Sequence, residues 1–98
     1  MAKAYKAKAK EVLHLSVELD EMASKAGGMA YIAQQMGKKK GLVNVAVKLE
    51  RELHEKAFNY RYLYLSAQSY QDDIRAIDID KVRNEGDAAL KAVGALFQ

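Results

Sequence analysis

Apolar residues recur at helical spacing in the first quarter of the chain. Five of them follow steps of three and four, which places their side chains on one face of an α-helix: Val12, Leu15, Leu19, Met22 and Ala26. We predict an amphipathic helix over residues 2–26. It is expected to end at Gly27-Gly28, because glycine readily adopts the left-handed conformation of a helix C-cap. A second, short helix is predicted over 29–36.

The middle of the chain, residues 42–77, contains no glycine and no proline. A seven-residue repeat runs through it, as is typical of a helix that packs along its length against another helix. Nine of the ten repeat positions are apolar or aromatic: Ala46, Leu49, Leu53, Lys56, Tyr60, Leu63, Ala67, Tyr70, Ile74 and Ile77. We predict one continuous helix over 42–77. Aromatic residues alternate over 58–64, which is also the period of a strand. Strong helix formers on both sides, with no turn residue between, favour the helix.

A last helix is predicted over 80–97, with Asp78 or Asp80 able to cap its N-terminus. Residues 88–97 are apolar apart from Lys91. This tail is too short to span a bilayer, and we expect it to dock on other parts of the protein. The fold class is therefore all-α, either an elongated helical hairpin or a three- or four-helix bundle with one long central helix. Residues 1–98 are expected to form a single domain.

The length of the central helix suggests an assembly. Thirty-six helical residues reach about 54 Å, whereas a compact domain of this size is about 30 Å wide. Its tyrosines wrap much of the helix circumference, and tyrosine is enriched at protein interfaces. We expect self-association, or packing into a larger complex, through Leu49, Leu53, Tyr60, Tyr62, Leu63, Tyr64 and Tyr70. The alternative is a compact bundle with a bend near residues 66–69.

Composition excludes several classes of protein. Half of the residues are hydrophobic, which is too many for a disordered chain. Cysteine is absent, so disulfides and thiolate metal sites are excluded. No apolar stretch approaches the roughly 20 residues of a membrane span. The N-terminal lysines are not followed by the apolar core of a secretory signal. We expect a cytoplasmic location, or an assembly built from cytoplasmic protein.

Candidate chemistry in the sequence is weak. Glu11 and His14 form a Glu-x-x-His pair, but the helix places them on the polar face, away from a bundle core that could hold a metal. Glu50 and His54 stand four residues apart, as exposed charge pairs often do. The acidic run from Asp78 to Asp87 lacks the glycine of a calcium loop. Residues 37–41, Gly-Lys-Lys-Lys-Gly, lack the strand and the ending of a phosphate-binding P-loop. We predict no enzyme activity, no metal, no cofactor and no small-molecule substrate.

The basic residues suggest an alternative function. The net charge is +3, and residues 1–41 carry eight lysines against four acidic residues. Lysine clusters can neutralise phosphates of a nucleic acid without reading its bases. A small helical protein that binds nucleic acid without sequence specificity is therefore the second hypothesis. The lysines that would serve it are Lys3, Lys6, Lys10, Lys38, Lys39 and Lys40. A solvated surface, or head-to-tail contact with the acidic residues near Asp72, would explain the same charges.

The tyrosine-rich arm of the predicted hairpin runs through Tyr64-Leu65-Ser66-Ala67-Gln68-Ser69. In this it resembles the subunits of type III secretion needles, over about a fifth of the chain. The proline-containing turn of that family is missing, and about twenty further residues follow where its subunits end. No function and no site residue is taken from this resemblance.

Overall fold

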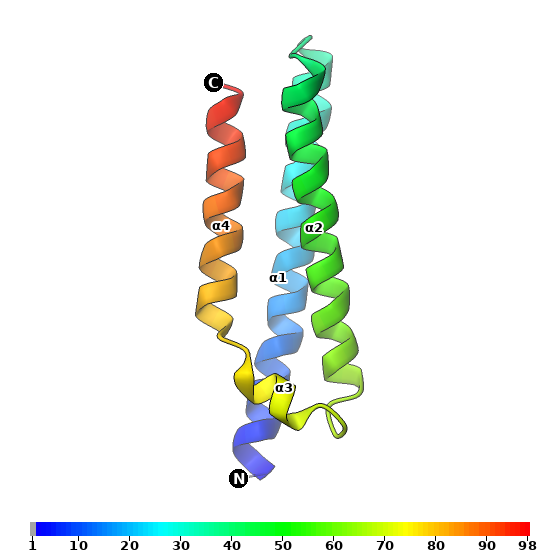
Figure 1. Ribbon diagram of the computed structural model, residues 1–98, viewed down its shortest axis with the longest axis vertical. Coiled ribbons are helices and arrows are strands. Elements are labelled where there is room, and N and C mark those ends of the chain that lie inside the picture. Colours follow the sequence, from blue (N-terminus) through cyan, green and yellow to red (C-terminus); the bar gives the residue numbers. More distant parts are fainter. Residues whose placement is uncertain (1) are drawn as a thin grey trace.

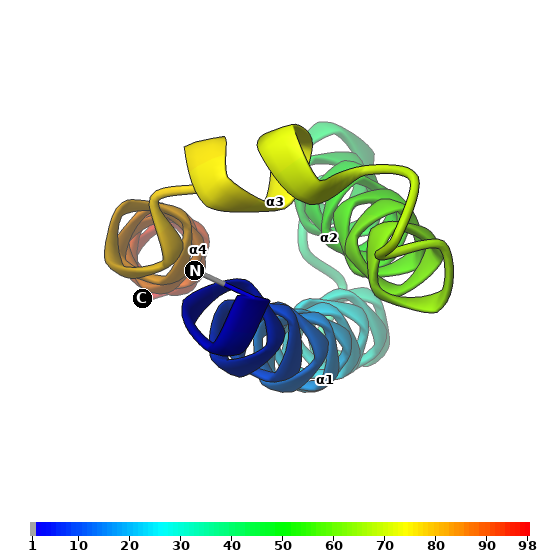
Figure 2. The same ribbon diagram turned by 90° about the horizontal axis from the view of Figure 1, so that it is seen from below.

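The computed structural model describes residues 2–98, with side chains from residue 6 onward. It contains the helices α1 (Ala2–Gln35), α2 (Lys40–Leu65), α3 (Gln71–Ala76) and α4 (Ile79–Leu96). α1 and α2 form an antiparallel hairpin, and α4 runs beside α1 in the same direction (Figure 1). Viewed from below, these three helices stand at the corners of a triangle, and α3 crosses the lower end from α2 to α4 (Figure 2). The predicted all-α fold is confirmed, and no strand occurs in residues 2–98.

One face of α1 forms the centre of the core. The larger hydrophobic cluster joins this face to α2 and α4, and a smaller cluster at the lower end joins Ala9 and Val12 to Ile74 of α3. All five residues of the predicted apolar stripe are buried: Val12, Leu15, Leu19, Met22 and Ala26. The periodicity of the first helix was therefore sufficient to identify the side of α1 that faces the core.

The expected break at Gly27-Gly28 is wrong. α1 continues to Gln35, so the segments predicted over 2–26 and 29–36 form one helix. Neither glycine has a positive φ; in the described chain only Gly37, at +72°, does. The apolar stripe continues past the pair with the buried residues Ala30 and Ala33. Packing of this stripe against α2 outweighs the helix-weakening effect of two glycines, which is roughly 0.5–1 kcal/mol each.

Substitution of Gly28 tests whether α1 is a continuous helix through the two glycines. A Cβ at Gly28 has nothing within 4 Å, so Gly28→Ala should raise the free energy of unfolding by about 0.5–1 kcal/mol, because alanine loses less backbone entropy in a helix. Thermal unfolding followed by circular dichroism should show a melting temperature several degrees higher. Gly37→Ala is the matched control and should destabilise the protein, since φ at Gly37 is +72°. A destabilising Gly28→Ala would contradict a continuous α1.

The single helix predicted over 42–77 is also wrong, and the bend considered as its alternative is present. α2 ends at Leu65, residues 66–69 form a turn, and α3 begins at Gln71. On a straight helix a seven-residue repeat drifts by about 20° per heptad, so Ile74, four heptads after Ala46, would point about 80° away from α1. The turn brings Ile74 back to Ala9 and Val12, where it is fully buried. The segment that resembled needle subunits is this turn and the end of α2.

The other two helix predictions agree with the structure. Residues 58–64 lie inside α2, so the alternating aromatics do not form a strand. α4 spans Ile79–Leu96, and the Asp78 side chain caps it by accepting a hydrogen bond from the backbone N–H of Lys81 at 3.1 Å. The apolar tail docks on α1, where Leu90 and Val93 are buried in the larger cluster.

The molecule is elongated, and α1 runs along nearly its whole length (Figure 1). Its principal extents are 53 × 19 × 15 Å, and its radius of gyration is 15.6 Å, against about 13 Å for a compact domain of this length. A thin three-helix rod has a large surface for its volume, so part of its apolar surface stays exposed. The location of that exposed apolar surface decides which interactions the protein can make.

Candidate interaction surfaces

The seven residues predicted as an interface divide into buried and accessible groups. Leu49 and Leu53 are 9% and 3% exposed and belong to the chain's own core. Since they are buried in a cluster formed with α1 and α4 of the same chain, they do not face a partner, and we leave them out of the surface proposed below. Leu63 and Tyr64 are half-buried against the lower cluster that contains Ile74.

The remaining three tyrosines lie toward the lower end. Tyr60 is half-buried and contacts both clusters; burial, with a smaller effect of the Glu85 charge, raises the pKa of its hydroxyl. Tyr62 is 52% exposed. The ring of Tyr70 packs against that of Tyr62, with centroids 5.9 Å apart and planes inclined by 56°. Of the seven residues, Tyr62 is the one that presents a largely exposed ring.

Larger exposed apolar side chains stand on a neighbouring stripe of α2. Phe58 is 66% exposed and Leu65 is 75% exposed, and their seven-residue separation places them on the same side of the helix. Neither Phe58 nor Leu65 is among the seven interface residues predicted from the sequence. Their spacing indicates that they share one side of the helix, since Phe58, Arg61 and Leu65 form a second stripe at steps of three and four.

Ion pairs place this stripe beside α1. The Asp20 carboxylate on α1 accepts hydrogen bonds from Arg61 at 2.5 Å and from His54 at 3.1 Å. His54 lies four residues before Phe58, and Arg61 three residues after it, so the seam between the two helices runs alongside Phe58. On α1, Val17 lies three residues before Asp20 and is 45% exposed. We call Val17, Phe58, Tyr62 and Leu65 the outer hairpin face.

The same ion pairs act on the titration of Asp20. Partial burial raises the pKa of its carboxyl, but the hydrogen bonds from Arg61 and His54 outweigh burial, and the net pKa is lowered. Asp20 is therefore ionised at neutral pH. Its bonds to His54 and Arg61 hold α1 and α2 in register beside the outer hairpin face.

A second group of exposed apolar side chains surrounds the opposite end of the hairpin. Five of them lie on α1 and α2 near the loop that joins these helices, at the upper end of Figure 1, and the sixth lies at the C-terminal end of α4. Among the described residues, six of the ten large exposed hydrophobic side chains belong to this group: Tyr31, Ile32, Met36, Val45, Val47 and Leu96. We call these six residues the apolar collar.

The structure separates the lysines of the nucleic-acid hypothesis into two groups. Lys38, Lys39 and Lys40 lie at the loop between α1 and α2. Lys6 and Lys10 are exposed near the start of α1, about 45 Å away at 1.5 Å per helical residue. Lys3 lies in the first turn of α1, ahead of the side chains that are described. The two groups therefore do not form one continuous basic patch.

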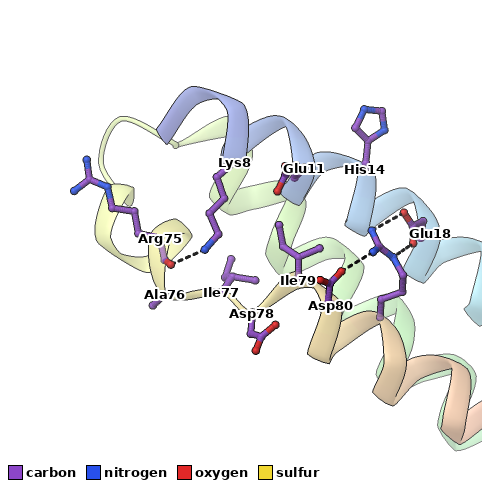
Figure 3. Close-up of a pocket in the computed structure, with 11 residues that line it drawn as sticks. Lys8, Glu11, His14, Glu18, Arg75, Ala76, Ile77, Asp78, Ile79 and Asp80 are labelled. Atoms are coloured by element: carbon purple, nitrogen blue, oxygen red, sulfur yellow. Dashed lines mark hydrogen bonds and ion pairs between the residues drawn. The ribbon is translucent and has the colours of Figure 1, made fainter. Parts of the chain in front are cut away.

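An open cleft of about 840 Å³ lies where α1, α3 and α4 meet (Figure 3). Charged groups across it are already paired. Arg83 donates to the Glu18 carboxylate at 2.6 and 3.1 Å and to Asp80 at 3.0 Å, and the bonds to Glu18 raise the pKa of the Arg83 guanidinium. Lys8 donates to the Arg75 carbonyl at 2.6 Å. These contacts fasten α3 and α4 to α1.

The candidate metal and acid–base groups are dispersed. His14 points away from the ion pairs of the cleft (Figure 3). The Glu50 carboxylate lies against Gly27, whereas His54 bonds to Asp20. Asp78 and Asp80 serve the first turn of α4, the former as its cap and the latter as a partner of Arg83. Over the described part of the chain, no three His, Cys, Asp or Glu residues gather where they could hold a metal ion.

Two further observations concern the chain as a whole. Within residues 2–98, no helix combines the length and the apolar character that crossing a membrane requires. No protein-family model, no curated protein and no solved structure matches the chain.

Proposed function

We propose that this chain is a non-enzymatic helical protein that acts by packing against other proteins, and first against a second copy of itself, through the outer hairpin face. The observation that carries this proposal is the exposure of Phe58 and Leu65, at 66% and 75%. Burying such side chains releases about 25 cal/mol per Å² of apolar surface. The length of the central helix does not support the proposal, because α2 ends at Leu65.

A two-fold arrangement fits the outer hairpin face. In a symmetric dimer the same patch of both copies meets itself. An axis near Arg61 sets Phe58 of each copy against Leu65 of the other, since Arg61 lies between them on one stripe. This axis also brings the two Arg61 side chains together, but each is already paired with Asp20 of its own chain. Like-charge repulsion across the axis is thereby reduced.

We place this function ahead of nucleic-acid binding for a geometric reason. Electrostatic binding to a duplex strengthens with the number of phosphates that are neutralised together. The two lysine groups stand at opposite ends of a molecule 53 Å long, so they do not act as one site. The outer hairpin face, in contrast, lies on two helices, α1 and α2, that pack against each other.

The double variant Phe58→Glu/Leu65→Glu tests the proposal. The wild-type protein should elute from gel filtration with a light-scattering mass well above the 10.9 kDa of one chain. The double variant should elute as a monomer. An uncompensated charge buried in an interface costs on the order of 3 kcal/mol, so the dissociation constant should rise by more than about 100-fold.

Asn84→Glu is the matched control. Asn84 is exposed and lies on α4, which carries no residue of the outer hairpin face. This variant adds a negative charge away from the proposed interface and should keep the wild-type mass. Circular dichroism should show equal helicity for all three proteins. A wild-type protein that remains a 10.9 kDa monomer at every concentration would overturn the proposal.

A further inference from the structure

The upper end of the molecule carries positive charge without compensation. No acidic residue occurs in residues 22–49 or in residues 88–98, and these segments form the upper part of the α1–α2 hairpin and the end of α4 (Figure 1). Six lysines lie in them: Lys25, Lys38, Lys39, Lys40, Lys48 and Lys91. The whole chain has a net charge of only +3, so the residues outside these two segments carry a net charge of −3.

Three of these lysines are concentrated at the loop. Lys39 and Lys40 are exposed, and Lys38 is half-buried; none of the three makes an ion pair within the described residues. The N-terminus of α2 begins here, with no acidic residue in its first turn and no side-chain cap. The positive end of a helix dipole therefore adds to the lysine charges. We call residues 37–41 the basic tip.

The apolar collar encircles the basic tip instead of lying along one side. Tyr31 and Ile32 are successive residues and point 100° apart on α1, and Val45 and Val47 point about 160° apart on α2. Leu96 adds an apolar side chain at the end of α4. A partner helix needs one continuous apolar stripe to dock on. A ring of exposed apolar residues around a charged tip offers no such stripe.

The apolar collar extends only a short distance along the helices from the end of the hairpin. Tyr31 lies four residues before the end of α1, and Val47 lies seven residues after the start of α2. At 1.5 Å per residue, all collar residues of the hairpin fall within about 10 Å of its end. This matches the roughly 5–10 Å to which apolar side chains enter the boundary between headgroups and acyl chains of a bilayer.

We propose that the basic tip and the apolar collar bind the surface of an anionic lipid bilayer, with the hairpin standing end-on. A bilayer surrounds an inserted tip on all sides, which is the arrangement that an encircling collar fits. Lysines pair with anionic headgroups, and the ring of Tyr31 lies at the level where aromatic residues favour the membrane interface. The opposite end carries charges of both signs, with Lys6 and Lys10 exposed on α1 and Asp72 and Asp73 exposed on α3, and it faces away from the membrane.

Binding to lipid vesicles tests the proposal. The 98-residue chain is sedimented with vesicles of phosphatidylcholine alone and with vesicles that contain about one third phosphatidylserine. Wild-type protein should bind the anionic vesicles and leave the neutral ones largely unbound. Each lysine near an anionic surface strengthens binding several-fold, so Lys38→Gln/Lys39→Gln/Lys40→Gln should weaken it by about 100-fold. The matched control Lys6→Gln/Lys10→Gln/Lys56→Gln removes the same charge from exposed positions elsewhere and should bind like the wild type.

A fluorescent reporter separates insertion from adsorption. The chain contains no tryptophan, so Tyr31→Trp introduces a single probe in the collar, and Tyr62→Trp introduces one in the outer hairpin face. On anionic vesicles the emission of Tyr31→Trp should shift to shorter wavelength and be quenched by brominated lipid. The emission of Tyr62→Trp should change little.

Three outcomes would overturn the proposal. One is equal binding by the two lysine triple variants, which would mean that net charge alone drives it. Another is an unchanged Tyr31→Trp emission on vesicles that do bind protein, which would exclude insertion of the collar. The last is binding to a DNA duplex that depends on Lys38–Lys40, with no binding to anionic vesicles, which would identify a nucleic acid as the anionic partner.

Discussion

Leu19→Ala should lower the free energy of unfolding by about 3–5 kcal/mol. Leu19 is fully buried at the centre of the larger cluster. Its Cδ2 lies 3.7 Å from the position of a Cβ at Gly86, so α4 approaches α1 closely at this point. Shortening the side chain removes buried apolar surface and leaves a cavity that this close packing cannot fill. Domains of this size have a total stability of about 5–15 kcal/mol, so the variant should lose a large part of it.

Urea unfolding followed by circular dichroism measures this loss. Val17→Ala is the matched control, because Val17 lies two residues earlier on the same helix and is 45% exposed. It should change the free energy of unfolding by less than about 0.5 kcal/mol. Both variants should be compared at low protein concentration, since self-association also stabilises the folded chain. Equal losses from Leu19→Ala and Val17→Ala would contradict the packing of α4 on this face of α1.

Ile74→Ala should release the lower end of the molecule. Ile74 is fully buried, and it is the one buried residue of α3. A helix of six residues has little stability of its own, so the contact of Ile74 with Ala9 and Val12 holds α3 in place. Truncation of this side chain should lower the free energy of unfolding of the whole chain by about 2–4 kcal/mol. The connection between α2 and α4 should then open more often than the α1–α2 hairpin unfolds.

Limited digestion with trypsin detects this opening directly. Arg75 lies next to Ile74, and its carbonyl accepts the hydrogen bond from Lys8 at 2.6 Å, so its peptide bond is held in the folded protein. Ile74→Ala should be cleaved after Arg75 much faster than the wild-type protein. Asp73→Ala, an exposed change in the same helix, should leave the cleavage rate near that of the wild type. Unchanged cleavage in Ile74→Ala would show that α3 is held by other contacts.

The surfaces were less predictable than the helices. Wraparound aromatics over 58–64 suggested burial on several sides, yet Phe58 is 66% exposed while Leu63 and Tyr64 are half-buried. Sequence spacing defines the relative angles of these side chains but not which angle faces α1. The excess of positive charge at the upper end is visible in the sequence, because no acidic residue occurs between Glu21 and Glu50. The lysine clusters alone do not reveal it.

The sequence by itself determined the helical class and the buried face of α1, and it limited the cap of α4 to Asp78 or Asp80. Each depends on local spacing or on a neighbouring residue, such as the carboxylate of Asp78 and the N–H of Lys81 three positions later. Only the tertiary structure decided that α1 continues through Gly27 and Gly28 and that α2 ends at Leu65. Both depend on contacts between residues far apart in the chain. Packing against α2 keeps the glycines helical, and burial of Ile74 against Ala9 and Val12 turns the chain before α3.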